Sequence, residues 1–430
     1  MKFNKSILSL IFIIATHYVI AQKNIFFDSM YTQPISTVDW QKADAEELKP
    51  FEKILDTYDL LTLAEPYHNE GASYDAQCMI VKGLIDKGAI KVVYTESSWL
   101  NIEKINAVLK KYGRDSIVGV KKYMNSVALF YWTQNGFWEY LANQIINNKV
   151  RLVGIDIGVP NNIMHELLNE FASQDSSFFY QREYNDVRVD LGQILNSVYD
   201  VNYSEVLYNE STIFVNKAID FYKSENALYK VNQWQMIASY LYWRYYRNFD
   251  LDGNRLLAPF DDGKRETFFH AIRDSIMCDI FVDNWQPAHS KAVLLISAYH
   301  AMRNSSYIEN LDDSVKFNYV NTFGERLDRK KILKIYNLCF ISSFGYRGLI
   351  SPIEKSSTKV THPKKNSIEQ YLAKKTYPYL FVDFNGFCEN SFYMNAFNKG
   401  YLKAKWGKVF SGVFFIKKMY PMQWFNLKLY

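Results

Sequence analysis

The sequence predicts an α/β fold in which a mostly parallel central sheet is flanked by helices and carries a helical insertion that forms a cap. Short apolar runs alternate with segments whose apolar residues recur at helical spacing, which is the pattern of βαβ units. Four of the apolar runs end in polar side chains suited to catalysis. With 430 residues and 48% apolar content, the chain can bury a large core, so a disordered chain is not expected.

The first βαβ unit begins at Leu60–Ala64, an apolar run that predicts a buried strand. The loop EPYHNEG follows, and Ala72–Lys87 then places apolar residues at helical spacing. Lys91–Thr95 predicts the second strand. Because strand, loop, helix and strand succeed one another, the two strands are expected to lie parallel in one sheet.

The pattern continues along the chain with one long interruption. Between about residues 160 and 260 helical periodicity predicts an insertion, within a single domain that spans residues 22–430. Residues 354–366, EKSSTKVTHPKKN, predict a solvated loop. Four further strands are expected at Val150–Ile155, Ala292–Ser297, Ile335–Ser343 and Val409–Ile416, with helices at Asn101–Tyr112, Phe137–Asn147 and Phe268–Asp283.

The amino end has the composition of a secretory signal. It begins with the basic segment MKFNKS, continues with the apolar run ILSLIFIIATHYVIA, and reaches small Ala21 before polar Gln22. A membrane anchor is the alternative, but the apolar run is short and is interrupted by Thr16 and His17. We therefore expect residues 1–21 to be cleaved, no stable membrane insertion afterwards, and an exported protein, periplasmic or secreted.

The charge balance narrows the expected partners. The formal net charge is +5, and removal of Lys2 and Lys5 with the signal lowers it to +3. This excess is too small to indicate binding to nucleic acid or to an anionic membrane surface. A small-molecule substrate is the expected partner.

The cysteines form no CxxC pair, so they predict neither a zinc site nor a dense disulfide framework. Three of them lie in apolar runs, where buried free thiols are expected. An exported protein can also form one or two bridges, and the pairing stays open for Cys78, Cys278, Cys339 and Cys388.

Polar side chains follow four of the predicted strands at the points where the strands end. Because the carboxyl ends of parallel strands meet at one edge of a sheet, groups far apart in the sequence converge there. One strand-end carboxylate alone indicates little, since such residues commonly cap helices. Four in order, two of them with histidine, predict an active site formed by Glu65 with His68, Glu96, Asp156 and His300.

The chemistry of this set is only partly defined by the residues. The chain has no GxSxG, HExxH, P-loop or GxGxxG segment, which removes the usual support for serine hydrolases, zincins and nucleotide enzymes. Ser97 and Ser98 follow a predicted strand, where serine more often caps a helix than attacks a substrate. A histidine beside carboxylates can take a proton from water, and the same set can hold a metal. Two cases stay open: no cofactor, or a divalent metal.

Five segments carry a family pattern and span Leu60 to about Arg303: LTLAEPYHNEG, VVYTE, VRLVGIDI, RDSIMCDIF and AVLLISAYHAM. In this order they resemble the erythromycin esterase family, within a superfamily that also holds the ChaN-like and Tiki proteins. The family pattern is GExxHG, a strand ending in Glu, a strand ending in Gly-x-Asp, an RD-x-x-Met helix, and a late strand followed by histidine. The resemblance implies a metal-independent hydrolase of ester bonds.

The resemblance also implies roles for four candidate catalytic residues. His68 would be the general base that activates water against an ester carbonyl. Glu65 and Glu96 would orient or polarise the water and the histidine. His300 would help to bind the substrate or the developing oxyanion.

Four further residues would bind substrate or support the histidines. Asp156 matches the Gly-x-Asp position. Arg273 and Asp274 match the RD pair, for which catalysis and a buried structural ion pair are both open. Tyr299 is a candidate because it can be aligned, in place of His300, with the first histidine of the late motif.

The chain departs from the family pattern at several positions. Ala64 and Asn69 stand where the family has glycine, and only Gln77 and Lys82 lie near the place of the family's helix arginine. Fewer cations at the site mean weaker stabilisation of an oxyanion. Two other functions therefore stay open: a metal- or haem-binding protein of the ChaN-like kind, and a relative that binds a ligand without turnover.

Overall fold

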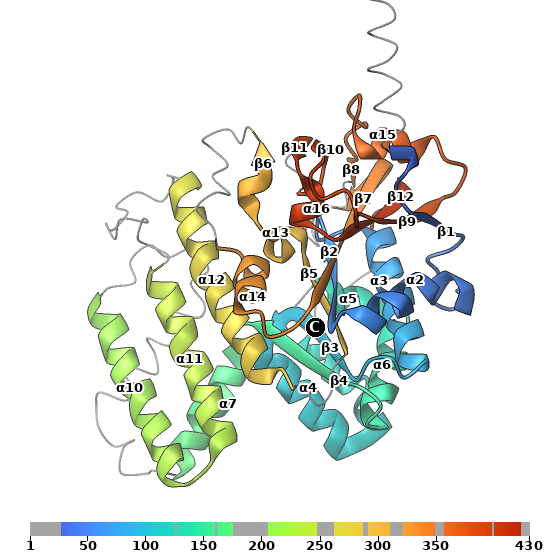
Figure 1. The fold of residues 1–430 in the computed structure, drawn as a ribbon. Coiled ribbons are helices and arrows are strands. Elements are labelled where there is room, and N and C mark those ends of the chain that lie inside the picture. The colour runs from blue at the N-terminus through green and yellow to red at the C-terminus, as the bar shows by residue number, and fades with distance from the viewer. Residues whose placement is uncertain are drawn as a thin grey trace, which may run out of the picture.

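A nine-stranded sheet forms the centre of the computed structural model, which describes residues 27–124, 127–159, 161–174, 205–246, 262–286, 291–309, 321–348, 357–397 and 400–422 (Figure 1). The strands are β1 (Thr32–Ile35), β2 (Leu60–Glu65), β3 (Val92–Ser98), β4 (Arg151–Asp156), β5 (Ala292–Ser297), β7 (Ile335–Gly348), β8 (Ser357–Lys359), β9 (Tyr379–Asp383) and β12 (Gly412–Met419). Their order is β1-β9-β12-β7-β2-β5-β3-β4, and β8 pairs with β7. A separate three-stranded sheet joins β10 (Phe392–Met394), β11 (Leu402–Ala404) and β6 (Ile308–Glu309).

The central sheet is mixed but mostly parallel, as the sequence predicts. From β12 through β7, β2, β5 and β3 to β4, each strand runs parallel to the next. β9 is antiparallel to both β12 and β1, and β8 is antiparallel to β7. The carboxyl ends of β2, β3, β4 and β5 therefore share one edge of the sheet.

Helices cover both faces of the sheet (Figure 1). On one side lie α2 (Ala45–Thr57), α3 (Gly71–Asp86), α4 (Trp99–Tyr112), α5 (Val127–Gln134) and α6 (Phe137–Ile146). On the other side lie α7 (Asn161–Gln174), α10 (Glu205–Ser224), α11 (Leu228–Tyr246), α12 (Asp262–Asn284) and α14 (Phe323–Lys330). Shorter helices are α13 (Ala298–Ala301), α15 (Ile368–Ala373) and α16 (Trp406–Val409).

Successive strand residues alternate between two cores. Leu61 and Leu63 of β2 belong to the core on the side of α3, whereas Leu60 and Ala64 belong to the core on the side of α12. All four side chains are buried. Because both faces of these strands are covered, the sequence shows continuous apolar runs there instead of alternating polar and apolar residues.

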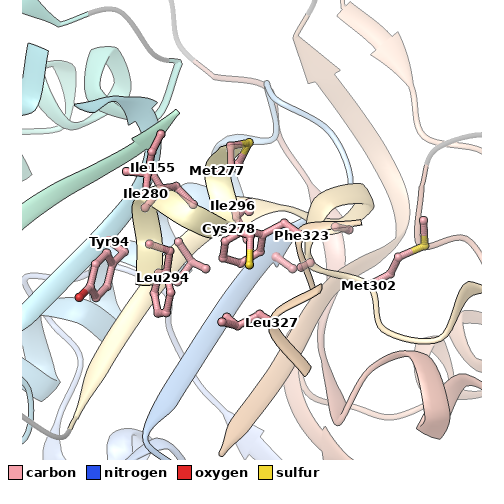
Figure 2. Packing of buried hydrophobic residues seen from close by; sticks show 14 of the residues in the cluster. Tyr94, Ile155, Met277, Cys278, Ile280, Leu294, Ile296, Met302, Phe323 and Leu327 are labelled. Atoms are coloured by element: carbon pink, nitrogen blue, oxygen red, sulfur yellow. The ribbon is translucent and has the colours of Figure 1, made fainter. Parts of the chain in front are cut away.

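Apolar side chains in the second half of α12 fix this helix to the sheet. Met277, Cys278 and Ile280 pack in one cluster with Ile155 of β4 and Leu294 of β5 (Figure 2). Residues 273–274 lie about one helical turn before Met277. The packing of Met277, Cys278 and Ile280 therefore holds residues 273–274 beside the ends of the strands.

The differences from the predicted elements concern short or antiparallel strands and the start of the last strand, since Val409 ends α16 and β12 begins at Gly412. The prediction of a plain loop at residues 354–366 is wrong at β8, which pairs with the part of β7 that extends beyond the predicted end of that strand. The antiparallel strand β9 was not predicted. The insertion is present as α7, α10 and α11, while residues 175–204 and 247–261 and the expected signal at 1–21 lie outside the described residues.

Two further findings concern membrane-spanning helices and the cysteines. In the parts of the chain that the structure describes, no helix combines the length and apolarity needed to cross a bilayer. All four cysteines are free thiols: Cys78, Cys278 and Cys339 are buried, and Cys388 is half-buried.

Candidate active site

A cavity of about 200 Å³ lies at the carboxyl edge of the parallel strands, and we name it the strand-edge cavity. β2, β3, β4 and β5 contribute to its wall, together with the loop after β2, α3, α5 and α12. The described residues of α7, α10 and α11 do not line it. Its lining residues are Glu65, His68, Tyr74, Gln77, Thr95, Glu96, Ala128, Asp156, Arg273 and Leu295.

His68 and Glu65 form a hydrogen-bonded pair in the strand-edge cavity. His68 Nδ1 lies 3.1 Å from Glu65 Oε1, and the other carboxylate oxygen accepts from Gln77 Nε2 at 3.0 Å. Glu65 is buried, whereas the His68 side chain is 41% exposed. With Nδ1–H donated to Glu65, His68 Nε2 is the nitrogen that can accept a proton.

The loop that carries His68 is fixed by close backbone contacts just after the histidine. A Cβ atom at Gly71 would lie 2.8 Å from Pro421 O, so only glycine allows the carboxyl-terminal segment to come this near. Two residues before Gly71, Asn69 O accepts a hydrogen bond from Gly348 N–H at 3.1 Å. The ends of β7 and β12 thus hold the loop in place.

Glu96 lies in a β-bulge. The register between β3 and β4 shifts between Thr95 and Ser98, and a Cβ atom at Gly154 would lie 2.6 Å from Ser98 O. The glycine of the Gly-x-Asp segment therefore permits the bulge, a device that re-aims side chains at strand ends. Ser297 N–H donates to Glu96 Oε2 at 2.8 Å. Ser98 is the N-cap of α4, as the sequence predicts, and its hydroxyl accepts from the first turn.

Arg273 joins the ends of three strands. Its Nε donates to Asp156 Oδ1 at 3.0 Å, and its Nη2 donates to Asp156 Oδ2 at 2.7 Å and to Glu96 Oε1 at 2.9 Å. Nη1 lies 2.9 Å from His300 Nε2. Burial lowers the pKa of Arg273, but the charges of Asp156 and Glu96 raise it by more than burial lowers it. The net shift is upward, so the guanidinium stays charged. Arg273 thus binds Asp156 through two parallel hydrogen bonds and binds Glu96 through a third.

His300 is buried between Arg273 and Asp274. A guanidinium can only donate, so His300 Nε2 accepts from Arg273 and the ring proton resides on Nδ1, which donates to Asp274 Oδ1. Burial lowers the pKa of His300, while Asp274 and Glu96 raise it, with a net upward shift. A second ring proton on Nε2 would face Nη1 of Arg273, so this contact favours the neutral ring, whereas Asp274 and Glu96, whose Oε1 lies 3.5 Å from Nε2, favour the charged ring.

The carboxylates of the strand-edge cavity act on His68 as well. Burial lowers the pKa of His68, but the hydrogen bond that His68 donates to Glu65 and the charges of Glu96 and Glu65 outweigh it and raise the pKa to about 9. Burial raises the pKa of Glu96, yet the charges of His300 and Arg273 lower it to about 2. Glu96 is thus ionised, and His68 carries its extra proton more readily than an isolated histidine.

The structure places the predicted residues at different distances from this cavity. Glu65, His68, Glu96, Asp156 and Arg273 line it, whereas His300 and Asp274 lie behind Arg273.

Tyr299 does not line the strand-edge cavity. Its ring packs against His300 at 5.3 Å and against His270 of α12 at 5.2 Å, centroid to centroid. His270 and Tyr74 were not predicted as site residues from the sequence. A usable signal exists for Tyr74, because it precedes Gln77 by three residues, a spacing that puts both on one face of α3.

The donor set fits a positively charged side chain better than a metal ion. Among the described residues, no group of three or more His, Cys, Asp or Glu side chains is arranged to hold a metal. Both carboxylate oxygens of Asp156, Oε1 of Glu96 and Nε2 of His300 are directed at Arg273. A cavity of about 200 Å³ is also small for haem.

Fold and site together define an α/β protein with histidines and carboxylates gathered around one arginine at the carboxyl edge of its sheet. The fold is erythromycin esterase-like, as three solved structures show. A histidine-to-asparagine variant of the erythromycin esterase EreC, in its open conformation, has a TM-score of 0.66 and 14% identity, over 93% of this chain and 100% of that one.

Two further solved structures share this fold. A protein from Bacillus cereus has a TM-score of 0.68 and 14% identity, over 94% of this chain and 99% of that one. A succinoglycan biosynthesis protein has a TM-score of 0.66 and 13% identity, over 93% and 97%. No family model and no curated protein matches the sequence itself.

Proposed function

We propose that this chain is an exported hydrolase of small carboxylic esters in which His68 activates water. The observation that carries the proposal is the His68–Glu65 pair, whose imidazole lines a polar cavity with Nε2 as its proton acceptor. The erythromycin esterase-like fold agrees with this chemistry. The described lining residues include no serine or cysteine, which favours direct attack by water over a covalent enzyme intermediate.

In the proposed reaction, neutral His68 takes a proton from water at Nε2 while the water oxygen attacks the ester carbonyl carbon. The π electrons move to the carbonyl oxygen and form an oxyanion. When the carbonyl re-forms, the C–O bond to the alcohol breaks, and the leaving alkoxide takes the proton back from His68. The products are an acid and an alcohol, and Glu65 stabilises the transient imidazolium.

Arg273 has a positioning role in this proposal. It holds Glu96 and Asp156 at the ends of neighbouring strands and fixes the ring of His300 by a contact at 2.9 Å. We propose that the reaction needs no metal, because the lone pairs that would bind one are directed at this guanidinium. Asp274 in turn holds His300 from the buried side.

Export forms the second part of the proposal and rests on the sequence of residues 1–22. Expression of the full chain in a bacterial host is expected to give a periplasmic or secreted protein whose first residue is Gln22. Amino-terminal sequencing after cell fractionation tests this. A cytoplasmic protein that retains residues 1–21 would contradict it.

The hydrolase proposal is tested with a panel of p-nitrophenyl esters of increasing acyl length, with and without a chelator. His68→Ala is expected to lower kcat/KM roughly 100- to 10,000-fold, the range for loss of a general base. The exposed His362 provides the matched control, His362→Ala, which is expected to keep full activity. Equal activity in His68→Ala would overturn the role of His68, and loss of activity with the chelator would overturn the metal-free reaction.

A further inference from the structure

We propose that the Tyr74 hydroxyl is a catalytic residue that donates a hydrogen bond to the oxyanion formed during hydrolysis. This inference rests on the proposed ester hydrolysis and adds the group that stabilises its transition state. Tyr74 is on the first full turn of α3 and lines the strand-edge cavity together with Glu65 and His68.

Negative charge develops on the carbonyl oxygen in a cavity that is already rich in carboxylates. Three of them, Glu65, Glu96 and Asp156, line the cavity beside the single guanidinium of Arg273. An additional negative charge is costly in such surroundings unless a hydrogen-bond donor is aimed at it. The cavity therefore needs a donor that is not already committed to these carboxylates.

The other donors that line the cavity have partners. Each of the three nitrogens of Arg273 contacts Asp156, Glu96 or His300. Gln77 Nε2 donates to Glu65 and to a backbone carbonyl. The hydroxyl of Thr95 lies 3.3 Å from that of Ser97.

Tyr74 is the exception among these lining donors. Its side chain is 1% exposed, and its hydroxyl makes no hydrogen bond with any residue that the structure describes. A buried phenol usually has a partner, so a hydroxyl at a cavity wall without one is suited to a ligand. The ring is held by packing against Tyr131, with centroids 5.5 Å apart, so the donor is preorganised.

The protonation of Tyr74 also suits the role. Burial raises its pKa well above 10, and the charges of Glu65, Glu96 and Glu70 add to the shift. The phenol therefore keeps its proton at a pH where His68 has lost its own and works as a base. An exposed tyrosine would begin to ionise in that same range.

Tyr74→Phe removes the hydroxyl and keeps the ring, so it tests the inference directly. We expect kcat for a p-nitrophenyl ester to fall roughly 100- to 1,000-fold with KM changed little, as for removal of one oxyanion donor. The matched control is Tyr131→Phe. Its ring packs against Tyr74, but its hydroxyl donates to Asp75 at 2.8 Å, so the kcat of this variant is expected to stay near that of the wild type.

A pair of inhibitors separates this role from a structural one. A trifluoromethyl ketone forms a hydrate that resembles the tetrahedral intermediate, whereas the matching methyl ketone stays in the ground-state form. Tyr74→Phe is expected to weaken binding of the first by roughly the same factor as kcat and to leave binding of the second unchanged.

The outcomes distinguish the inference from the proposed function. An active wild type with an equally active Tyr74→Phe, or equal weakening of both ketones, would overturn the role of Tyr74 alone. A wild type without ester hydrolysis would overturn the proposed function and this inference with it.

Discussion

Two cavities flank the first turn of α3, and they differ in how their carboxylates are neutralised. Tyr74 lines the strand-edge cavity, while the next residue, Asp75, lines a second cavity of about 430 Å³ between the segment Thr37–Gln41 and the carboxyl-terminal segment. In the strand-edge cavity Arg273 and His68 lie among the carboxylates. In the second cavity the described lining includes no Lys, Arg or His.

Asp75 is held by neutral donors instead. Tyr131 and Tyr420 donate their hydroxyl hydrogens to it at 2.8 and 2.5 Å, and Asn135 Nδ2 lies at 3.3 Å. These bonds tie α5 and the segment after β12 to α3. The larger cavity therefore has a carboxylate with a structural role, whereas the smaller one combines carboxylates, an imidazole and a guanidinium. The chemistry of the lining, and not the volume, marks the candidate active site.

The largest loss of stability and activity is expected when Arg273 is replaced. Arg273→Met leaves Glu96 and Asp156 without their partner, and loss of one member of a buried ion pair costs about 3–5 kcal/mol of the free energy of unfolding. Hydrolytic activity should be lost as well. Denaturant unfolding measures the first effect, and the p-nitrophenyl ester assay measures the second.

A surface ion pair supplies the control for this variant. Lys104 pairs with Glu166, and their side chains are 34% and 47% exposed, against 18% for Arg273. Lys104→Met is expected to cost less than about 1 kcal/mol. Equal losses in the two variants would show that the cluster around Arg273 stabilises the fold no more than an ordinary surface pair.

The sequence predicted the strand-edge cavity better than the second one for a physical reason. In parallel strands the end of each apolar run marks the same edge of the sheet, so Glu65, Glu96 and Asp156 could be grouped without knowledge of the fold. Asp75 gave no such signal. It contacts Tyr420, which follows it by 345 residues and comes from a segment with no polar motif of its own.

The position of Arg273 was only half predictable. The RD pair was recognised, but catalysis and a structural ion pair could not be distinguished, because the choice depends on how α12 lies on the sheet. That placement comes from Met277, Cys278 and Ile280, whose apolar character is visible in the sequence while their partners on β4 and β5 are not (Figure 2). Similarly, the bulge at Glu96 depends on contact with Gly154 across two strands.

A second prediction concerns the pH dependence of kcat/KM. It tests whether the charges of the strand-edge cavity, and not those of the second cavity, shift the pKa of His68. Because the pKa of His68 is raised to about 9, the neutral base is a minor form at pH 7. We expect kcat/KM to rise roughly tenfold per pH unit up to about pH 9 and then to level off. A pH profile of the wild type measures this.

The control for the pH profile is Asp75→Asn, which should leave the midpoint unchanged because the charges that act on His68 are those of Glu65, Glu96 and Arg273. A plateau that begins near 6.5, the ordinary value for histidine, would show that the carboxylates of the strand-edge cavity do not act on this base.

The smallest effect is expected in the second cavity, for the stability of Asp75→Asn. Burial raises the pKa of Asp75, partly offset by the hydrogen bonds from Tyr420 and Tyr131. A carboxyl whose folded-state pKa is raised gives stability that is complete at low pH and is lost as the pH rises through that pKa. The wild type therefore bears a small penalty at neutral pH that an amide does not, while the amide oxygen still accepts from the tyrosines.

We expect the free energies of unfolding of the wild type and of Asp75→Asn to differ by less than about 1 kcal/mol at pH 7.5, with the variant favoured more there than at pH 4. Urea unfolding at both pH values checks this, and a loss above about 2 kcal/mol at pH 7.5 would mean that the charge of Asp75 has a partner of its own, as the carboxylates around Arg273 do.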